Sequence, residues 1–223
     1  MGQNKIIWIS LLFVFLISCV NPNVLNADYA FSDVKKSIVN QVGENDMFVH
    51  FPENITSDCL RMTYTSPSEE GSDCTGDLYL TYGFDESVVE QLSNDSIFYS
   101  TEYRDSTNII INMFELKRNF FPIAKCNKWF SGKYPIPYFE NFDFGLGEHK
   151  DEKVVKGQTY WNCIYTVPND LRIFVISARS GEFWKKGCDE NRPEILKEWK
   201  NGYSSGIAIS KETNRVIYWA MVW

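Results

Sequence analysis

The stretch 216–223 constrains the fold more than any other part of the chain. Two sets of apolar side chains alternate along it: Val216, Tyr218, Ala220 and Val222 in one set, and Ile217, Trp219, Met221 and Trp223 in the other. Successive side chains of a β-strand point to opposite faces, so both faces of this strand are apolar. We therefore expect a central strand covered on both sides. It should pair in a hairpin with residues 206–210 across the polar turn 211–215.

The remainder of the chain contains many short strand-like runs and few helical patterns. Further strands are expected at 47–51, 60–65, 77–84, 97–103, 108–114, 160–167 and 171–178. The polar turn 104–107 separates two of these runs, which predicts a second hairpin. Apolar periodicity and capping residues predict helices at 31–42, 85–92 and 191–200. Strands and helices do not alternate in βαβ units, so the sequence predicts an α+β fold. We expect a mainly antiparallel sheet with about three short helices.

The N-terminus has the pattern of an export signal. Lys5 precedes the apolar run 6–17, which is shorter than the roughly 20 residues that a membrane-spanning helix needs. The run ends in Leu16-Ile17-Ser18-Cys19, which resembles the lipobox of a bacterial lipoprotein precursor. The resemblance implies cleavage before Cys19, a signal peptide over 1–18, and a diacylglyceryl thioether with fatty acids such as palmitate on Cys19. The alternative is an ordinary secretory signal cleaved after Ala27, which the large Leu25 disfavours.

The lipoprotein resemblance also sets the expected domain boundaries and location. Residues 19–28 are short, polar and rich in Asn, so we expect a tether there and one domain over 29–223. In a Gram-negative cell, Val20 after the lipidated cysteine resembles cargo destined for the outer membrane. Residues 20–25 lack an acidic run that resembles a surface-export tag. The expected location is the cell envelope, on the periplasmic face of the outer membrane.

The charge of the chain excludes one class of partner and favours another. The full chain carries a net charge of −7, and removal of residues 1–18 with their single Lys gives −7 − 1 = −8. Phosphate contacts need clustered Lys and Arg, and no basic run is present, so nucleic acid is not an expected partner. An acidic surface instead suits a basic protein partner. Nothing in the sequence indicates a cofactor.

The cysteines suggest one disulfide. If Cys19 carries lipid, an odd number remains, namely Cys59, Cys74, Cys126, Cys163 and Cys188. Cys59 and Cys74 flank a polar loop, and a bridge between them would add roughly 3 kcal/mol of stability. The alternative is that both are small buried apolar residues. No pair has zinc-ligand spacing and the two histidines are isolated, so no metal site is expected.

Two short motifs suggest catalysis, and neither has the context that catalysis requires. Residues 202–206 match G-x-S-x-G around Ser204, but a helix is expected before them and a strand after them, and no His follows His149. The glycines are better explained as a helix stop and a tight turn. His149 lies among acids at 148–152, which we interpret as a solvated charged loop rather than an acid–base or metal cluster. For His50 we expect a half-buried, hydrogen-bonded side chain.

Aromatic residues are concentrated in the Pro-rich, irregular segment 120–144. If exposed, Trp129, Tyr134 and Tyr138 would form a stacking platform for a glycan or an anchor for a protein. The more common alternative is a second core built from loops.

Together these observations predict a lipid-anchored, non-catalytic cell-envelope protein that binds another macromolecule. An immunity-type inhibitor of a toxin is one form that such a protein takes. The alternatives are a glycan-binding lipoprotein that uses the aromatic segment 120–144, and an envelope hydrolase. The expected contacts are the membrane, through the lipid anchor, and a protein partner, with a glycan as the second ligand class.

Overall fold

A computed structural model gives the arrangement of most of the chain. It describes residues 22–43, 46–65, 75–94, 99–105, 109–111, 134–139, 142, 144, 146, 148–155, 158–184, 199 and 201–223.

The centre of the molecule is a six-stranded sheet in which all neighbouring strands are antiparallel. From one edge to the other, its strands are β1 (Cys59–Thr65), β2 (Gly76–Gly83), β10 (Arg215–Val222), β9 (Gly202–Ser210), β8 (Arg172–Ser180) and β3 (Tyr99–Glu102). With the helices below, this arrangement confirms the predicted α+β fold with a mainly antiparallel sheet. It also confirms the hairpin between β9 and β10.

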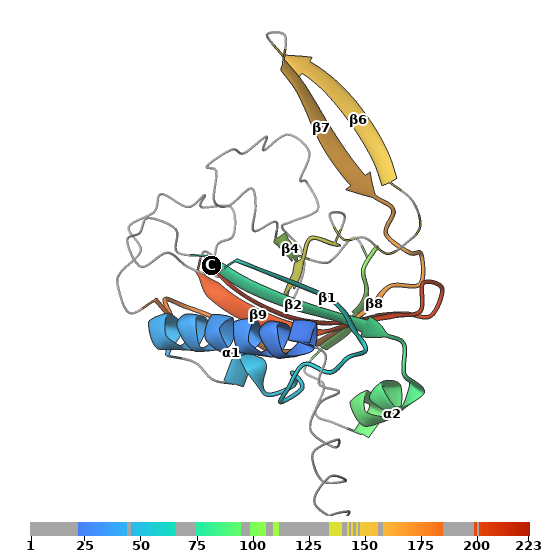
Figure 1. Ribbon diagram of the computed structural model, residues 1–223. Coiled ribbons are helices and arrows are strands. Elements are labelled where there is room, and N and C mark those ends of the chain that lie inside the picture. Colours follow the sequence, from blue (N-terminus) through green and yellow to red (C-terminus); the bar gives the residue numbers. More distant parts are fainter. Residues whose placement is uncertain are drawn as a thin grey trace, which may run out of the picture.

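Helices and small strand pairs surround this sheet (Figure 1). On one side lie α1 (Pro22–Val42), the 3-10 helix η1 (Asp46–Phe48) and α2 (Glu86–Asn94). On the other side lie the parallel pair β4 (Ile109–Ile111) and β5 (Pro135–Pro137). The hairpin of β6 (Glu148–Val155) and β7 (Gln158–Tyr165) projects away from the sheet.

The strand β10 is central and buried on both faces, as its sequence predicts. Ile217, Trp219 and Met221 belong to the core on the face of the sheet that β4 and β5 cover. Ala220 and Val222 point to the opposite face and belong to the core that α1 covers. Burial of each large side chain contributes about 1.5–3 kcal/mol, so this one strand joins both cores and supplies much of their stability.

The helix α1 has the predicted apolar face but begins earlier than expected. Phe31, Val34 and Ile38 are buried against the sheet, and Gly43, with φ of 82°, ends the helix. Helix already starts at Pro22, so the prediction of a tether through residue 28 is wrong for residues 22–28. Proline is favoured in a first helical turn because its missing N–H has no partner there in any case.

The helix α2 has the predicted start. The Asp85 carboxylate accepts a hydrogen bond from the Ser87 amide at 2.9 Å, as an N-cap does. The described residues contain two α-helices rather than about three. The helix predicted at 191–200 lies outside them, except for residue 199.

Two strand predictions are wrong. Residues 47–51 form part of η1 and the turn that follows, because Met47, Phe48 and Phe51 reach the core without any strand partner. The predicted hairpin of 97–103 with 108–114 does not form: β3 pairs with β8, and β4 pairs with β5. The chain leaves the sheet at Tyr103, whose amide donates to the Leu171 oxygen at 2.9 Å.

Candidate functional site

The G-x-S-x-G stretch lies inside β9 and is no nucleophile elbow. Ser204 is fully buried, and its hydroxyl donates a hydrogen bond of 2.6 Å to the Pro135 backbone oxygen. A nucleophile elbow instead exposes its serine at a turn between a strand and a helix. This geometry leaves Ser204 a structural role, tying β9 to β5.

Both glycines belong to β9, so the expected tight turn at 202–206 is wrong; the helix that Gly202 is expected to stop lies outside the described residues, except for residue 199. A Cβ atom on Gly206 would lie 2.1 Å from the Phe174 oxygen of β8. The neighbouring strand β8 contains a bulge between Val175 and Ser177. Glycine is required at position 206 because the two backbones approach closely there.

The two histidines lie in different parts of the fold. His50 is half-buried after η1 and hydrogen-bonded to the Trp219 oxygen, which confirms the expectation for it. His149 and the acids at 148–152 lie in β6, so the prediction of a loop is wrong. These charged residues form a strand because every residue of β6 pairs with a residue of β7, and backbone pairing does not require apolar side chains.

Most of the described aromatic residues of the segment 120–144 pack in the core that the sheet shares with β4 and β5. The Tyr134 ring packs edge-on against Tyr99 and Trp199, with centroids 5.4 and 6.2 Å away. Phe139 is completely buried in the same cluster. Tyr138 is half-buried, and Trp129 lies outside the described residues. Tyr134 therefore uses its ring in packing against the sheet core rather than in a separate core built from loops, while the glycan roles of Trp129 and Tyr138 stay predictions.

Cys59 is half-buried at the start of β1 and carries a free thiol in this structure. Burial raises the pKa of this thiol above its usual value. A low thiol pKa is what makes a cysteine reactive, so nothing here activates Cys59. Cys74 and the lipidation residue Cys19 lie outside the described residues, so the disulfide and the lipid anchor remain predictions.

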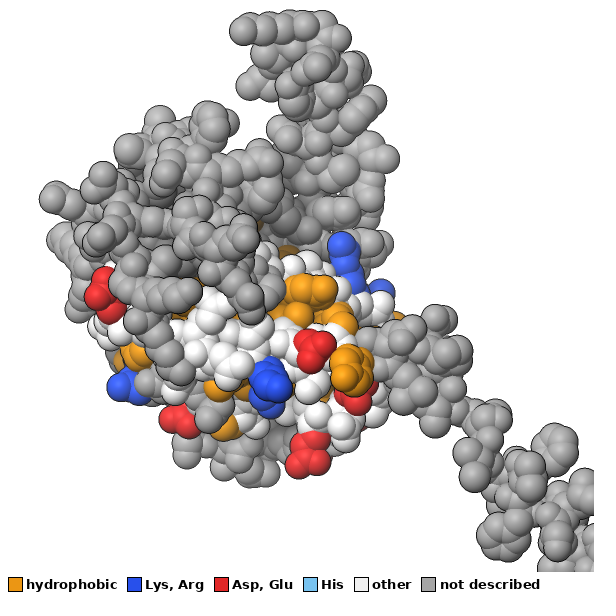
Figure 2. Space-filling view, turned by 60° about the vertical axis from the view of Figure 1, so that its left-hand side comes forward, with side chains coloured by type: hydrophobic (Ala, Val, Ile, Leu, Met, Phe, Trp, Pro, Cys, Tyr) orange, Lys and Arg blue, Asp and Glu red, His pale blue; other side chains and the backbone are white. Residues whose placement is uncertain are grey.

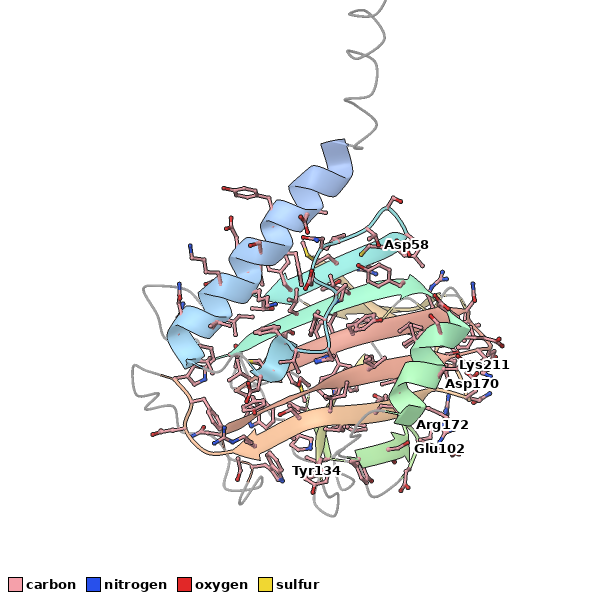
Figure 3. All side chains as sticks on the ribbon, turned by 90° about the horizontal axis from the view of Figure 1, so that it is seen from below. Asp58, Glu102, Tyr134, Asp170, Arg172 and Lys211 are labelled. Atoms are coloured by element: carbon pink, nitrogen blue, oxygen red, sulfur yellow. The ribbon has the colours of Figure 1, made fainter. Side chains whose placement is uncertain are left out.

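One end of the six-stranded sheet concentrates exposed charge, which the linear sequence does not reveal. Figure 3 shows Asp58, Glu102, Asp170, Arg172 and Lys211 along this end. We call it the charged end and define it by the strand termini and turns that meet there, together with the helix α2. Its acids are Asp58, Asp85, Glu86, Glu90, Glu102, Asp105, Asp170 and Glu212; its bases are Arg104, Arg172, Lys211 and Arg215.

Each base of the charged end contacts its own domain. Arg104 donates to the Val167 oxygen at 2.9 Å, and Arg215 donates to the Asn214 oxygen at 3.2 Å. The Arg172 guanidinium lies over the Phe174 ring at 5.6 Å, and Lys211 lies over the Phe84 ring at 5.5 Å. Among the residues that the structure describes there, acids outnumber these engaged bases, so their summed charge is negative.

Asp170 is the most constrained acid of the charged end. Its carboxylate accepts hydrogen bonds from the Ser210 hydroxyl at 2.6 Å and from the amides of Lys211 and Glu212 at 2.8 and 2.9 Å. Burial raises the pKa of Asp170, but these donors together outweigh it and hold the pKa below its usual value. Asp170 therefore holds the conformation of the turn between β9 and β10, which contains Lys211 and Glu212.

On the one face that Figure 2 shows, the described acidic and basic side chains are interspersed. On the face in Figure 2, hydrophobic side chains reach the surface among both acidic and basic ones. Within the described part of the chain, no group of three or more His, Cys, Asp or Glu side chains is placed to hold a metal ion. No helix among the described residues is long and apolar enough to cross a membrane.

Sequence-based prediction missed the charged end because its residues come from six separate strand ends and turns. The signal present in the sequence is that acids stand just before β1 and β8, just after β2 and β3, and in the turn between β9 and β10. Only the antiparallel strand order brings those turns to the same end. No known family model matches the chain, and no curated protein or solved structure matches it either.

Proposed function

We propose that this protein is a lipid-anchored, non-catalytic protein of the cell envelope that binds a basic protein through the charged end of its sheet. The observation that carries the binding surface is the excess of acids at the charged end, where each base already contacts its own domain. Complementary charge accelerates encounter and selects the partner. An immunity-type inhibitor that neutralises a cationic toxin fits this description.

The fate of the catalytic candidates supports a binding role over a hydrolytic one. The Ser204 hydroxyl is buried and already donates to a backbone oxygen, so it cannot attack a substrate. The His50 ring packs with the rings of Phe51 and Tyr218, and its Nε2 atom is hydrogen-bonded to the Trp219 oxygen. Neither residue has the geometry that nucleophilic catalysis needs.

Site-specific photo-crosslinking in the native cell envelope tests the binding surface. A photoreactive amino acid replaces Glu90 on α2, at the charged end, and in a matched chain it replaces Asp33 on the exposed side of α1. The expected result is one discrete adduct with a basic protein from position 90 and none from position 33. The double variant Glu86→Lys/Glu102→Lys should weaken the adduct at least tenfold.

Two results would contradict this proposal. Equal adduct yields from positions 90 and 33 would remove the charged end as the binding surface. Turnover of any esterase, glycosidase or peptidase substrate by the purified protein would contradict the non-catalytic role. The anchor is tested separately, because Cys19→Ala should abolish incorporation of a fatty-acid probe and leave the precursor uncleaved.

A further inference from the structure

The first helix begins almost at the residue predicted to carry lipid. Only Val20 and Asn21 separate Cys19 from Pro22, the first residue of α1. Three residues of chain reach at most about 10 Å even when fully extended. A lipid on Cys19 would therefore hold the N-terminal end of α1 close to the membrane surface.

The N-terminal half of α1 lies at the β1 edge of the sheet. Ala27 of α1 packs in the same core as Cys59 and Met62 of β1. The Asp28 carboxylate accepts a hydrogen bond from the Ile55 amide at 2.8 Å, just before β1 begins. Figure 3 shows α1 crossing the sheet obliquely, with its N-terminal end beyond the β1 edge.

This same edge carries large exposed apolar and aromatic side chains. Tyr29 of α1 is 75% exposed, and Leu60 and Tyr64 of β1 are 54% and 46% exposed. We call these three residues the β1 surface. Single exposed apolar residues are ordinary, but these three stand on the first turns of α1 and on the edge strand that α1 packs against, the two elements nearest the predicted anchor. Tyrosine is enriched at membrane interfaces because its ring is apolar and its hydroxyl stays hydrated.

We propose that the β1 surface faces the lipid bilayer and contacts the phospholipid headgroup layer. This inference rests on the lipid anchor of the proposed function. Near Leu60 in the sequence, the exposed acids Glu53 and Asp58 outnumber the one exposed base, Arg61, so attraction to anionic lipid does not drive the contact. The bilayer partner is instead a zwitterionic phospholipid surface, contacted through rings and an aliphatic side chain. At headgroup depth, water still satisfies the unpaired backbone groups of the strand edge.

With β1 facing the bilayer, the strand order predicts how far each strand lies from the membrane. Among the described strands, β1 and β3 form opposite edges of the six-stranded sheet. Neighbouring strands lie about 4.8 Å apart, so five steps place β3 about 24 Å farther from the bilayer than β1. The charged end runs along this height and remains open to a partner in the aqueous phase.

Fluorescence quenching in vesicles tests the orientation. The full-length, acylated chain is placed in phosphatidylcholine vesicles that contain a headgroup spin-labelled phospholipid. An environment-sensitive dye is attached through a ketone amino acid at Thr63 of β1 or, in the matched chain, at Ser100 of β3; both positions are exposed. We expect the fractional quenching at position 63 to be at least threefold that at position 100.

Variants of the β1 surface provide the second arm. Tyr29→Ser/Leu60→Ser/Tyr64→Ser should lower the quenching at position 63 at least twofold, while the chain stays acylated and keeps its unfolding transition. Leu146→Ser, which alters an exposed apolar residue outside the β1 surface, should leave the quenching unchanged. Equal quenching at positions 63 and 100 in an acylated chain would overturn the orientation alone. A mature chain without acyl groups on Cys19 would overturn the anchor and the orientation with it.

Discussion

The imidazole Nε2 of His50 lies 3.1 Å from the backbone oxygen of Trp219 and links the segment after η1 to the central strand β10. The ring also packs against Phe51, with centroids 4.7 Å apart. Burial lowers the pKa of His50 from 6.5 to about 4, the backbone contacts with Trp219 and Gly206 oppose this change, and the charge of Lys35 adds to it. The histidine is therefore neutral in the folded protein at neutral pH.

The lowered pKa of His50 predicts a loss of stability in mild acid. Because the folded-state pKa lies below the unfolded value, the stability contribution is complete above pH 6.5. It is lost as the pH falls through the range from 6.5 to about 4. A pKa difference of this size corresponds to at most about 3 kcal/mol. Urea unfolding of the wild-type chain between pH 7.5 and 4 measures it.

A matched pair of variants assigns this loss to one residue. His50→Gln removes the titrating group, so its unfolding free energy should depend less on pH over the same range. His149→Gln removes the other of the two histidines, which lies in the separate β6–β7 pair, and should keep the wild-type dependence. An unchanged pH dependence in His50→Gln would refute the assignment.

The close approach of β8 and β9 predicts a strong effect of adding one methyl group. In Gly206→Ala, the new Cβ would lie 2.1 Å from the Phe174 oxygen and 2.9 Å from the Trp219 ring. Backbone must move to relieve the first clash, so we expect a loss of about 3 kcal/mol or more. Gly83→Ala, which meets nothing within 4 Å, should change stability by less than about 1 kcal/mol. Chemical unfolding compares the two, and similar losses would contradict the geometry.

Local patterns in the sequence were sufficient to predict the elements whose packing depends on their own side chains. The apolar side chains on both faces of β10 indicated a central strand, because a strand in the middle of a covered sheet is buried on both faces. The spacing of Phe31, Val34 and Ile38 likewise revealed the buried face of α1. The N-cap Asp85 marked the start of α2 for a similarly local reason.

Long-range pairing decided the features that the sequence did not reveal. Tyr99 pairs with Val175 of β8, far along the chain, although a nearby turn suggested a local hairpin. Residues 148–152 have the composition of a loop but form a strand because β7 supplies a complete ladder. The charged end escaped prediction for the same reason, since Asp85 and Asp170 become neighbours of one surface only through the strand order.

The contacts of Asp170 predict a loss of stability on neutralisation. Asp170→Asn weakens the charge-assisted hydrogen bonds to Ser210 and to the following amides, so we expect a loss of about 1–2 kcal/mol at pH 7. The pKa of Asp170 is lowered in the fold, so this difference should shrink as the pH falls below the usual carboxylate pKa of 3.8. Glu90→Gln, on the exposed side of α2, is the control and should stay within about 0.5 kcal/mol. A larger loss in the control than in Asp170→Asn would contradict the assigned role.

The adjacent serines of β9 give the sharpest separation of structure from catalysis. Both side chains are fully buried, but the Ser204 hydroxyl donates to the Pro135 oxygen, whereas the Ser205 hydroxyl has no hydrogen-bond partner among the described residues. Ser204→Ala should therefore cost about 1–2 kcal/mol through loss of its buried hydrogen bond to the Pro135 oxygen, and Ser205→Ala should be neutral or stabilising. Partner binding should survive both substitutions.

Thermal and urea unfolding measure the stabilities, and a panel of hydrolase substrates measures turnover. A Ser204→Ala variant with unchanged stability and a loss of turnover of 10²-fold or more would establish a nucleophile and refute the structural role.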